Sequence, residues 1–295
     1  MTHKESFFQY LQIEKRYSIH TVRSYTNDLD QFFAFLESMS LPENPQEITS
    51  RDIRSWIVSM LEKGYTAVSV HRKISCLRVY FRYLRKEGHV SNDPLQKITL
   101  PRRKKQLPVF VEELAMDTVV DADPFGNDFT GLMNRTIIEM FYVTGMRRSE
   151  LTGLRVGDVD LAEATVKVTG KRNKQRIIPI IGTFIPQLKE YLRQRADFLN
   201  DREVEWFFIT GRCNKLYDKY VYNIVRRYLS MVTTIEKKSP HVLRHTFATH
   251  MLNHGADLNS IKELLGHANL AATQVYTHNT FEKLKKIYKQ AHPRA

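Results

Sequence analysis

Histidine and arginine stand three residues apart in the run Pro240–His245, which reads PHVLRH. On a helix, His241 and Arg244 would share one face. Such a pair suits a phosphate group, because a guanidinium binds two oxygens as a planar fork and an imidazole exchanges a proton near neutral pH. HVLRH also has the spacing of certain zinc sites, but Arg244 stands beside the would-be ligands and no glutamate base accompanies them. We therefore expect phosphate chemistry here and no metal.

Four further segments are weak signals one by one. They are Thr144–Leu151 (TGMRRSEL), Gly170–Lys174 (GKRNK), Leu264–His267 (LLGH) and Thr273–His278 (TQVYTH). Taken alone, Tyr276 in the last segment would be an ordinary structural aromatic. PHVLRH stands between GKRNK and LLGH in the chain. The five segments together, in their sequence order, resemble the tyrosine recombinase (phage integrase-like) family, and within it the two-domain Xer type. The resemblance spans essentially the whole chain.

The resemblance implies six catalytic residues, each placed by its motif: Arg147, Lys171, His241, Arg244, His267 and Tyr276. Tyr276 would attack a DNA phosphodiester and form a covalent 3′-phosphotyrosyl link. Arg147 and Arg244 would hold the non-bridging oxygens, where negative charge grows in the transition state.

The other three residues would handle protons. Lys171 would protonate the departing 5′ oxygen, because the alkoxide is otherwise a poor leaving group. His241 would accept the tyrosine proton or position the phosphate, and His267 would donate a hydrogen bond to it. Arg172 departs from the family pattern, which often has glycine after the lysine. The bond energy stays in the phosphotyrosyl link, so we expect no cofactor.

The family also implies partners. They are double-stranded DNA, held between two domains, and a homo- or hetero-tetramer with a sister recombinase on two DNA sites; a DNA translocase is a further candidate activator. After Tyr276 the chain carries an apolar helical face at Phe281, Leu284, Ile287 and Tyr288. This tail suits docking on a neighbouring protomer or on its own domain, and the spacing leaves both open.

The charge is concentrated in one segment. The chain has 45 Lys and Arg against 32 Asp and Glu, a net charge of +13, and residues 65–105 hold 11 of the basic and 2 of the acidic residues. Such a balance suggests a polyanionic partner, although a solvated helix face is the alternative. The candidate DNA-binding residues are Arg72, Lys73, Arg78, Arg82, Arg102, Arg103, Lys104 and Lys105.

Hydrophobic periodicity predicts a mainly α fold with a small antiparallel β-sheet. Residues 1–100 are expected to form a helical DNA-binding domain, SAM-like by the resemblance, with helices over 17–36, 49–62 and from Thr66 or Ser69 to about Gly88. Residues 101–108, with four consecutive cations, are expected to be a linker. Residues 109–295 would form a mixed α+β catalytic domain.

Within that second domain, hydrophobic periodicity and turn residues predict the elements. They are helices over 128–144 and 183–193, a hairpin of strands 164–169 and 175–180, a short strand over 206–209, and helices from Asp218 onward.

Composition and motifs also weigh against other classes. No apolar run approaches the ~18 residues of a membrane span, and the first residues lack a signal-peptide pattern. Two cysteines are too few for a disulfide framework, so a reducing cytoplasm fits best. The alternative kept open is an integrase or transposase of a mobile element with the same chemistry. The C-terminal tail and the two-domain outline argue against a type IB topoisomerase, and the presence of all six expected residues argues against a non-catalytic DNA-binding protein.

Overall fold

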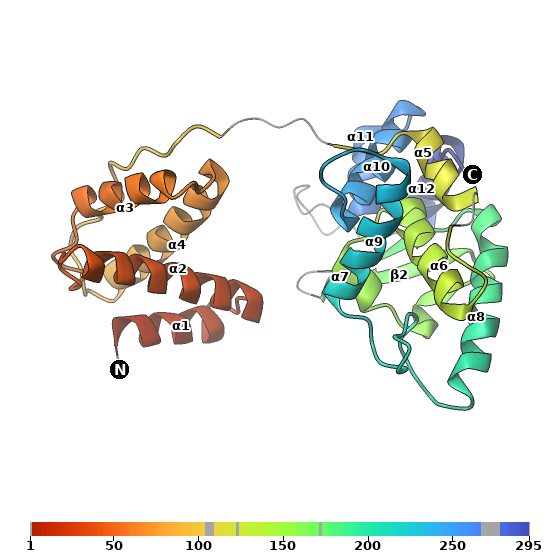
Figure 1. The fold of residues 1–295 in the computed structure, drawn as a ribbon, viewed down its shortest axis with the longest axis horizontal. Coiled ribbons are helices and arrows are strands. Elements are labelled where there is room, and N and C mark those ends of the chain that lie inside the picture. The colour runs from red at the N-terminus through yellow and green to blue at the C-terminus, as the bar shows by residue number, and fades with distance from the viewer. Residues whose placement is uncertain (1, 104–108, 122–123, 171–172, 267–277, 295) are drawn as a thin grey trace. The chain divides into compact units, whose positions relative to one another are not determined.

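The computed structural model describes residues 2–103, 109–121, 124–170, 173–266 and 278–294. The chain divides into two compact units, Met1–Gln106 and Leu107–Ala295. The division falls within the segment 101–108 that the sequence predicts as a linker. In the first unit the described elements are helices, and the second unit combines helices with a small sheet (Figure 1).

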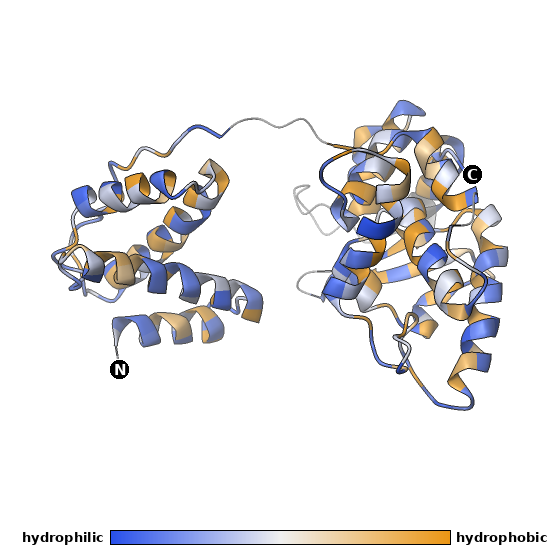
Figure 2. Ribbon diagram, in the orientation of Figure 1, coloured by the Kyte–Doolittle hydropathy of each residue, from blue (hydrophilic) through white to orange (hydrophobic). Residues whose placement is uncertain are grey.

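Four amphipathic helices build the first unit: α1 (His3–Ile13), α2 (Ile19–Ser38), α3 (Ser50–Glu62) and α4 (Ala67–Lys86). Each begins after a Ser or Thr whose side chain accepts a backbone N–H of the first turn. Polar and apolar residues interleave along all four (Figure 2). The apolar residues meet in one core, where Phe32 packs on Trp56 and Phe7 on Tyr80. The predicted helices of this unit are confirmed.

The second unit is organised around α6 (Phe129–Thr144), which is buried on almost every side. A helix that is apolar all round belongs in a core. Neighbouring helices cover it, namely α5 (Glu113–Asp121), α8 (Ile185–Leu199), α9 (Asp218–Val232) and α10 (Pro240–Asn253). The shorter helical elements are α7 (Arg148–Thr152), η1 (Val156–Asp158), η3 (Gly182–Phe184) and α11 (Leu258–Leu265), and α12 (His278–Ala291) follows near the end of the chain.

Three antiparallel strands form the sheet in the order β1 (Val159–Asp160), β2 (Thr165–Thr169), β3 (Gln175–Pro179). Val166 pairs with Ile178 and Val168 with Arg176, and these four side chains are buried. The predicted hairpin is therefore confirmed, although its tip residues 171–172 lie outside the described part.

One predicted element is wrong. Residues 206–209 form no strand; instead, single bridges link Trp206 to Arg155 and Ile209 to Lys215. Phe207 and Phe208 are buried, as the prediction of a short buried strand requires. The backbone, however, bends at these two residues, between the two bridges. None of the described helices combines the length and the apolar character that crossing a membrane requires.

The C-terminal helix α12 packs on its own unit. Leu284 and Tyr288 are buried against α10 and α11, and the Tyr288 hydroxyl donates to the Val143 carbonyl at 2.9 Å. Beyond the helix, the Arg294 guanidinium lies 2.9 Å from an Asp121 carboxylate oxygen. Of the two docking modes that the sequence leaves open, this structure contains the intramolecular one.

A buried histidine makes this tail sensitive to acid. His292 is only 4% exposed among aromatic rings, and burial lowers its pKa to about 4. The unfolded chain would protonate it near its ordinary pKa of ~6.5, so the stability that the neutral ring contributes is present above ~6.5 and lost as the pH falls toward ~4. Between pH 7.5 and pH 5 we expect this residue to account for a loss of about 2 kcal/mol.

Urea unfolding of the wild type and of His292→Phe at both pH values measures this contribution. The substitution keeps an aromatic ring and removes the titration, so the variant should lose about 2 kcal/mol less stability than the wild type on acidification. Equal pH dependence in the two proteins would contradict the assignment.

Candidate active site

Two of the predicted site arginines meet at the carboxyl end of α11. Arg147 is the N-cap residue of α7, and its Nη2 donates to the Gly266 carbonyl at 3.0 Å. Arg244 lies on α10, and its Nη2 donates to the Leu265 carbonyl at 2.6 Å. The last carbonyls of a helix lack intrahelical partners and carry its negative dipole end, so they attract cations. Residues nearly a hundred positions apart in the sequence are thereby brought together.

Arg244 is buried and held from two sides. Its Nη1 donates to the Gly145 carbonyl at 2.8 Å, at the end of α6. Burial first, and then the charges of Arg147 and Arg176, lower the pKa of Arg244 to about 9. The guanidinium therefore remains charged at neutral pH.

Glu150 joins the arginines into a network. It is buried, and it accepts hydrogen bonds from the backbone N–H of Arg147 at 2.7 Å and from Arg147 Nη1 at 2.8 Å. Arg176 donates to the same carboxylate from both terminal nitrogens, at 2.7 and 2.9 Å. Burial by itself would raise the pKa of Glu150, but the bonds and charges of Arg176 and then of Arg147 bring that pKa below its ordinary value. The carboxylate is therefore ionised.

His241 stands in the first turn of α10, one turn before Arg244. Its side chain is exposed at the surface. Partial desolvation, followed by the charges of Arg148 and Arg244, lowers the pKa of His241 below its ordinary value. A neutral imidazole in a positively charged neighbourhood can accept a proton.

Three predicted catalytic residues, Lys171, His267 and Tyr276, lie outside the described residues. Their described neighbours nevertheless border the arginine network. A Cβ placed on Gly170 would stand 3.3 Å from Glu150 Oε1 and 3.8 Å from Arg147 Nη1, so the base of the hairpin lies against the network. Gly266 immediately precedes His267 in the chain and accepts the bond from Arg147.

Sequence reasoning missed Glu150 and Arg176. Glu150 lies in the TGMRRSEL segment, three residues after Arg147, a spacing that places both on one helical turn. Arg176 lies on the buried face of β3, two residues before Ile178. A basic residue at a strand position that faces the core indicates that its charge has a partner, because an isolated buried charge is costly.

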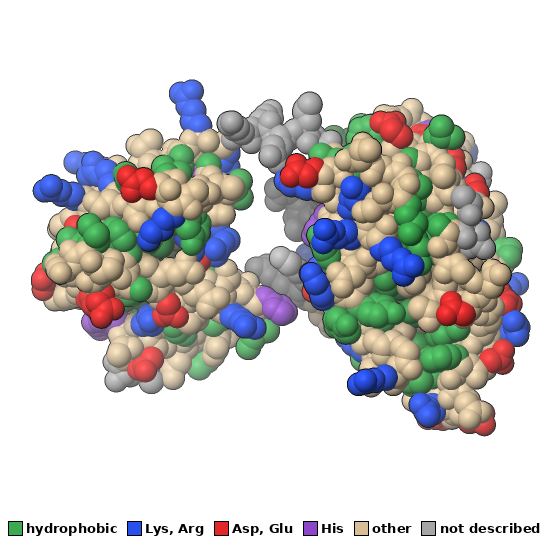
Figure 3. Space-filling view, in the orientation of Figure 1, with side chains coloured by type: hydrophobic (Ala, Val, Ile, Leu, Met, Phe, Trp, Pro, Cys, Tyr) green, Lys and Arg blue, Asp and Glu red, His purple; other side chains and the backbone are tan. Residues whose placement is uncertain are grey.

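The candidate DNA-binding residues of α4 divide into two groups. Arg78 and Arg82 are exposed, as are Arg102 and Arg103 beyond the helix. Lys and Arg side chains are visible at several points on the surface of the first unit (Figure 3). Lys104 and Lys105 lie outside the described residues.

Lys73 requires a correction. It is only 3% exposed, and its Nζ donates to Asp28 Oδ1 at 2.9 Å and to Gln31 Oε1 at 2.6 Å. Arg72 is half-exposed and also pairs with Asp28. A buried carboxylate on α2 thus engages Lys73 inside the unit, where it cannot reach a DNA phosphate in this conformation.

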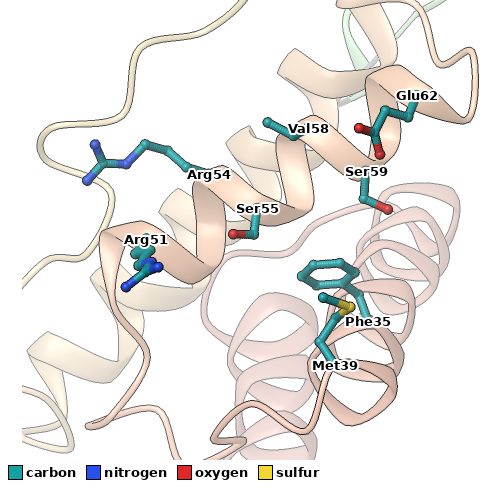
Figure 4. Close-up of a pocket in the computed structure, with 8 residues that line it drawn as sticks. All are labelled: Phe35, Met39, Arg51, Arg54, Ser55, Val58, Ser59 and Glu62. Carbon is teal, nitrogen blue, oxygen red and sulfur yellow. The ribbon is translucent and has the colours of Figure 1, made fainter.

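A groove of about 640 Å³ lies between α2 and α3 in the first unit. Phe35 and Met39 line it from α2, and Arg51, Ser55 and Val58 line it from α3 (Figure 4). It contains none of the predicted catalytic residues. In the described ranges, no group of three histidine, cysteine or acidic side chains is arranged to hold a metal ion.

Known proteins share both units. Residues 114–283 match the phage integrase family, and residues 5–88 match the phage integrase N-terminal SAM-like domain. A protein named tyrosine recombinase XerC from Oceanobacillus iheyensis is 38% identical over 99% of this chain and 96% of its own length. A protein of the same name from Chlorobaculum parvum is 37% identical over 99% of this chain and 94% of its own.

Solved structures share the fold. The XerA recombinase structure is 29% identical, covers 99% of both chains and has a TM-score of 0.50. The XerH recombinase, in a post-cleavage complex with its palindromic difH substrate, is 22% identical with a TM-score of 0.71, covering 96% of this chain and 93% of its own. The helical first unit, the arginine network of the second and this near-complete coverage lead to one conclusion: the chain belongs to the phage integrase family of tyrosine recombinases, enzymes that cleave and rejoin DNA strands.

Proposed function

We propose that this recombinase cuts one DNA strand at a time with Tyr276 as nucleophile and Arg147 and Arg244 as the phosphate clamp. The observation that carries the proposal is the convergence of the two guanidinium groups on the carbonyls of Leu265 and Gly266. A guanidinium has five N–H donors. Each of these two uses a pair of donors on described residues, so others remain for the non-bridging oxygens of a phosphate.

The electrostatics favour a phosphate at this place. Arg147, Arg176 and Arg244 bring three positive charges against the single negative charge of Glu150. The remaining positive charge would stabilise the extra negative charge of a pentacoordinate transition state. Because the protein groups are already bonded in place, little reorganisation is needed when that charge develops.

The reaction is a transesterification. Tyr276 Oη forms a bond to phosphorus and loses its proton to His241, while the bond from phosphorus to the 5′ oxygen breaks. Lys171 donates a proton to that oxygen, which leaves as a 5′-hydroxyl. His267 donates a hydrogen bond to the phosphate. A 5′-hydroxyl from a partner duplex then attacks the phosphotyrosine, reverses these proton transfers and releases the tyrosine.

The biological role we propose is Xer-like resolution of chromosome or plasmid dimers, performed in the cytoplasm by a tetramer on two sites. The relatives named XerC match almost end to end at 37–38% identity, which favours this role. A DNA translocase as activator belongs to the same proposal. Integration of a mobile element would use the same chemistry, and deletion of the gene distinguishes the two roles: accumulation of plasmid or chromosome dimers supports the first.

Replacement of Tyr276 by Phe tests the nucleophile. The variant should bind a nicked suicide duplex with wild-type affinity and form no covalent adduct, because only the hydroxyl is removed. Denaturing gels report the adduct, and gel shifts report binding. A protein–DNA band that survives SDS in the variant would assign the nucleophile to another residue.

Replacement of Lys171 by Ala tests the general acid. The variant should cleave an ordinary phosphodiester at least ~10²-fold more slowly than the wild type. On a substrate with sulfur in place of the 5′-bridging oxygen, its rate should approach the wild-type rate, since a thiolate leaves without protonation. Single-turnover rates on both substrates give the comparison. If the sulfur substrate restores nothing to the variant while the wild type cleaves it, Lys171 has another role.

Salt dependence tests the assignment of the α4 cations. With Arg78 and Arg82 both changed to Gln, affinity should fall for all DNA sequences alike, and the log–log salt slope should decrease by about 0.9 for each phosphate that the protein no longer neutralises. Lys73→Met is the control on the same helix. It should leave the slope unchanged and lower the free energy of unfolding by about 1–3 kcal/mol, because a buried hydrogen-bonded cation is removed. The opposite pattern would place the DNA on another surface.

A further inference from the structure

Arg176 is a buried cation whose charge belongs to the network but to which the reaction scheme assigns no contact with the phosphate. It lies on β3, only 7% exposed, on the strand face that also carries Ile178. β3 is the strand that follows the hairpin tip with Lys171. Burying an arginine is costly unless its donors are paired. The hydrogen-bond partners of Arg176 therefore indicate its structural role.

Among the described residues, the hydrogen bonds of Arg176 go to groups that border the site. The two terminal nitrogens form a fork on the Glu150 carboxylate, at 2.7 and 2.9 Å. The Nε donates to the Leu264 carbonyl at 2.7 Å, one residue before the carbonyl that Arg244 binds. A planar guanidinium fixes the direction of all these bonds at once, which an ammonium group cannot do.

Glu150 transmits this constraint to Arg147. Its Oε1 accepts from both Arg147 Nη1 and Arg176 Nη1, and its Oε2 accepts from the Arg147 backbone and from Arg176 Nη2. Each carboxylate oxygen thus holds one bond to each arginine. Without the fork from Arg176, the carboxylate would be held only by Arg147 itself, so Arg147 would lose a partner that is fixed independently of it.

The end of α11 rests on the same side chain. Gly266 has a left-handed backbone with φ 65°, and a Cβ added to it would lie 3.1 Å from Arg176 Cδ and 3.1 Å from its Nη1. The backbone therefore passes directly over the guanidinium, at the point where the chain leaves for His267 and Tyr276. One side chain on the hairpin strand β3 therefore contacts both the partner of Arg147 and the residue that precedes His267.

We propose that Arg176 is a positioning residue for strand cleavage, which acts by holding Arg147 through Glu150 and by fixing the carboxyl end of α11. The proposal rests on the proposed function. Arg176 itself does not touch the phosphate, so its loss should slow the chemical step while DNA binding persists. A displacement of about 1 Å in a catalytic group can cost on the order of 10²-fold in rate.

The second unit contains a matched control. Arg195 on α8 is also 7% exposed, and its guanidinium donates to the carbonyls of Val204, Trp206 and Phe207 at 2.6–3.0 Å. It resembles Arg176 in burial and in its backbone partners, but none of these partners borders the arginine network. Substituting Lys at each position retains the charge and removes the fork.

The experiment measures single-turnover adduct formation on a suicide duplex at saturating protein, with DNA affinity and melting temperature recorded for every variant. Arg176→Lys should bind DNA within about twofold of the wild type and cleave on the order of 10²-fold more slowly. Arg195→Lys should lose melting temperature and keep its cleavage rate within about threefold. Wild-type cleavage in Arg176→Lys, or an equal rate loss in both variants, would overturn the proposal. A wild-type chain that forms no adduct at all would overturn the proposed function instead.

A second readout separates positioning from general weakening of the fold. Glu150→Gln, Arg176→Gln and the double variant form a mutant cycle. If Arg176 acts through Glu150, the double variant should cleave about as slowly as the slower single variant, because one unit is disabled in each case. Rate losses that multiply would show that the two residues act independently, and the proposal would fail. The cycle uses rates of the folded protein, so a stability loss alone does not produce the expected pattern.

Discussion

The carboxyl end of α11 accepts hydrogen bonds from three arginines on three different elements, and the candidate site depends on this junction. Arg147 comes from the start of α7, Arg176 from β3 and Arg244 from α10. Three guanidinium groups in one place would repel one another. The partial negative charge of the helix end and the full charge of Glu150 together offset that repulsion. The result is a set of three cations that the protein's own groups hold together.

Core packing sets the spacing of this junction. Gly145 ends α6 with φ 58°, and a Cβ there would lie 2.4 Å from a Phe247 ring carbon and 2.8 Å from a Leu265 methyl carbon. The ends of α6 and α11 are therefore pressed together around Phe247 of α10, so the Gly145 carbonyl is within reach of Arg244. A larger residue at 145 would force these helix ends apart and displace the guanidinium. Hydrophobic packing and the placement of the Arg244 guanidinium consequently depend on the same close contacts.

The tail engages the same end of α6. Tyr288 on α12 donates to the carbonyl of Val143, two residues before Gly145. The chain that leads from Gly266 through the Tyr276 segment thus returns to the helix end that holds Arg244. A tail that left this position would uncover the buried side of Tyr288 and remove a partner from the Val143 carbonyl. The seating of α12 and the geometry near Arg244 are for this reason physically linked.

Periodicity and capping residues are sufficient to predict most helices and the hairpin, because these signals are local. Thr49 is an N-cap residue and so predicts where the helix over 50–62 begins. Gly145 predicts where the helix over 129–144 ends, because helices commonly end at a residue with a left-handed backbone. The strand prediction for residues 206–209 is wrong because burial of Phe207 and Phe208 imitates a strand, although each bridge partner comes from elsewhere in the chain. Trp206 pairs with Arg155, about fifty residues earlier, whereas Ile209 pairs with nearby Lys215, and neither pairing extends beyond a single bridge.

The same limit explains the errors among the charged residues. Lys73 and Arg78 stand one and a half turns apart on α4 and look alike in sequence, but only Lys73 faces Asp28 on α2. The strand position of Arg176 indicates a buried cation, but nothing in the nearby sequence identifies Glu150 as its partner. A net charge of +13 counts every cation equally. On α4, the buried carboxylate of Asp28 holds Lys73 inside the unit, whereas Arg78 and Arg82 remain exposed at the surface.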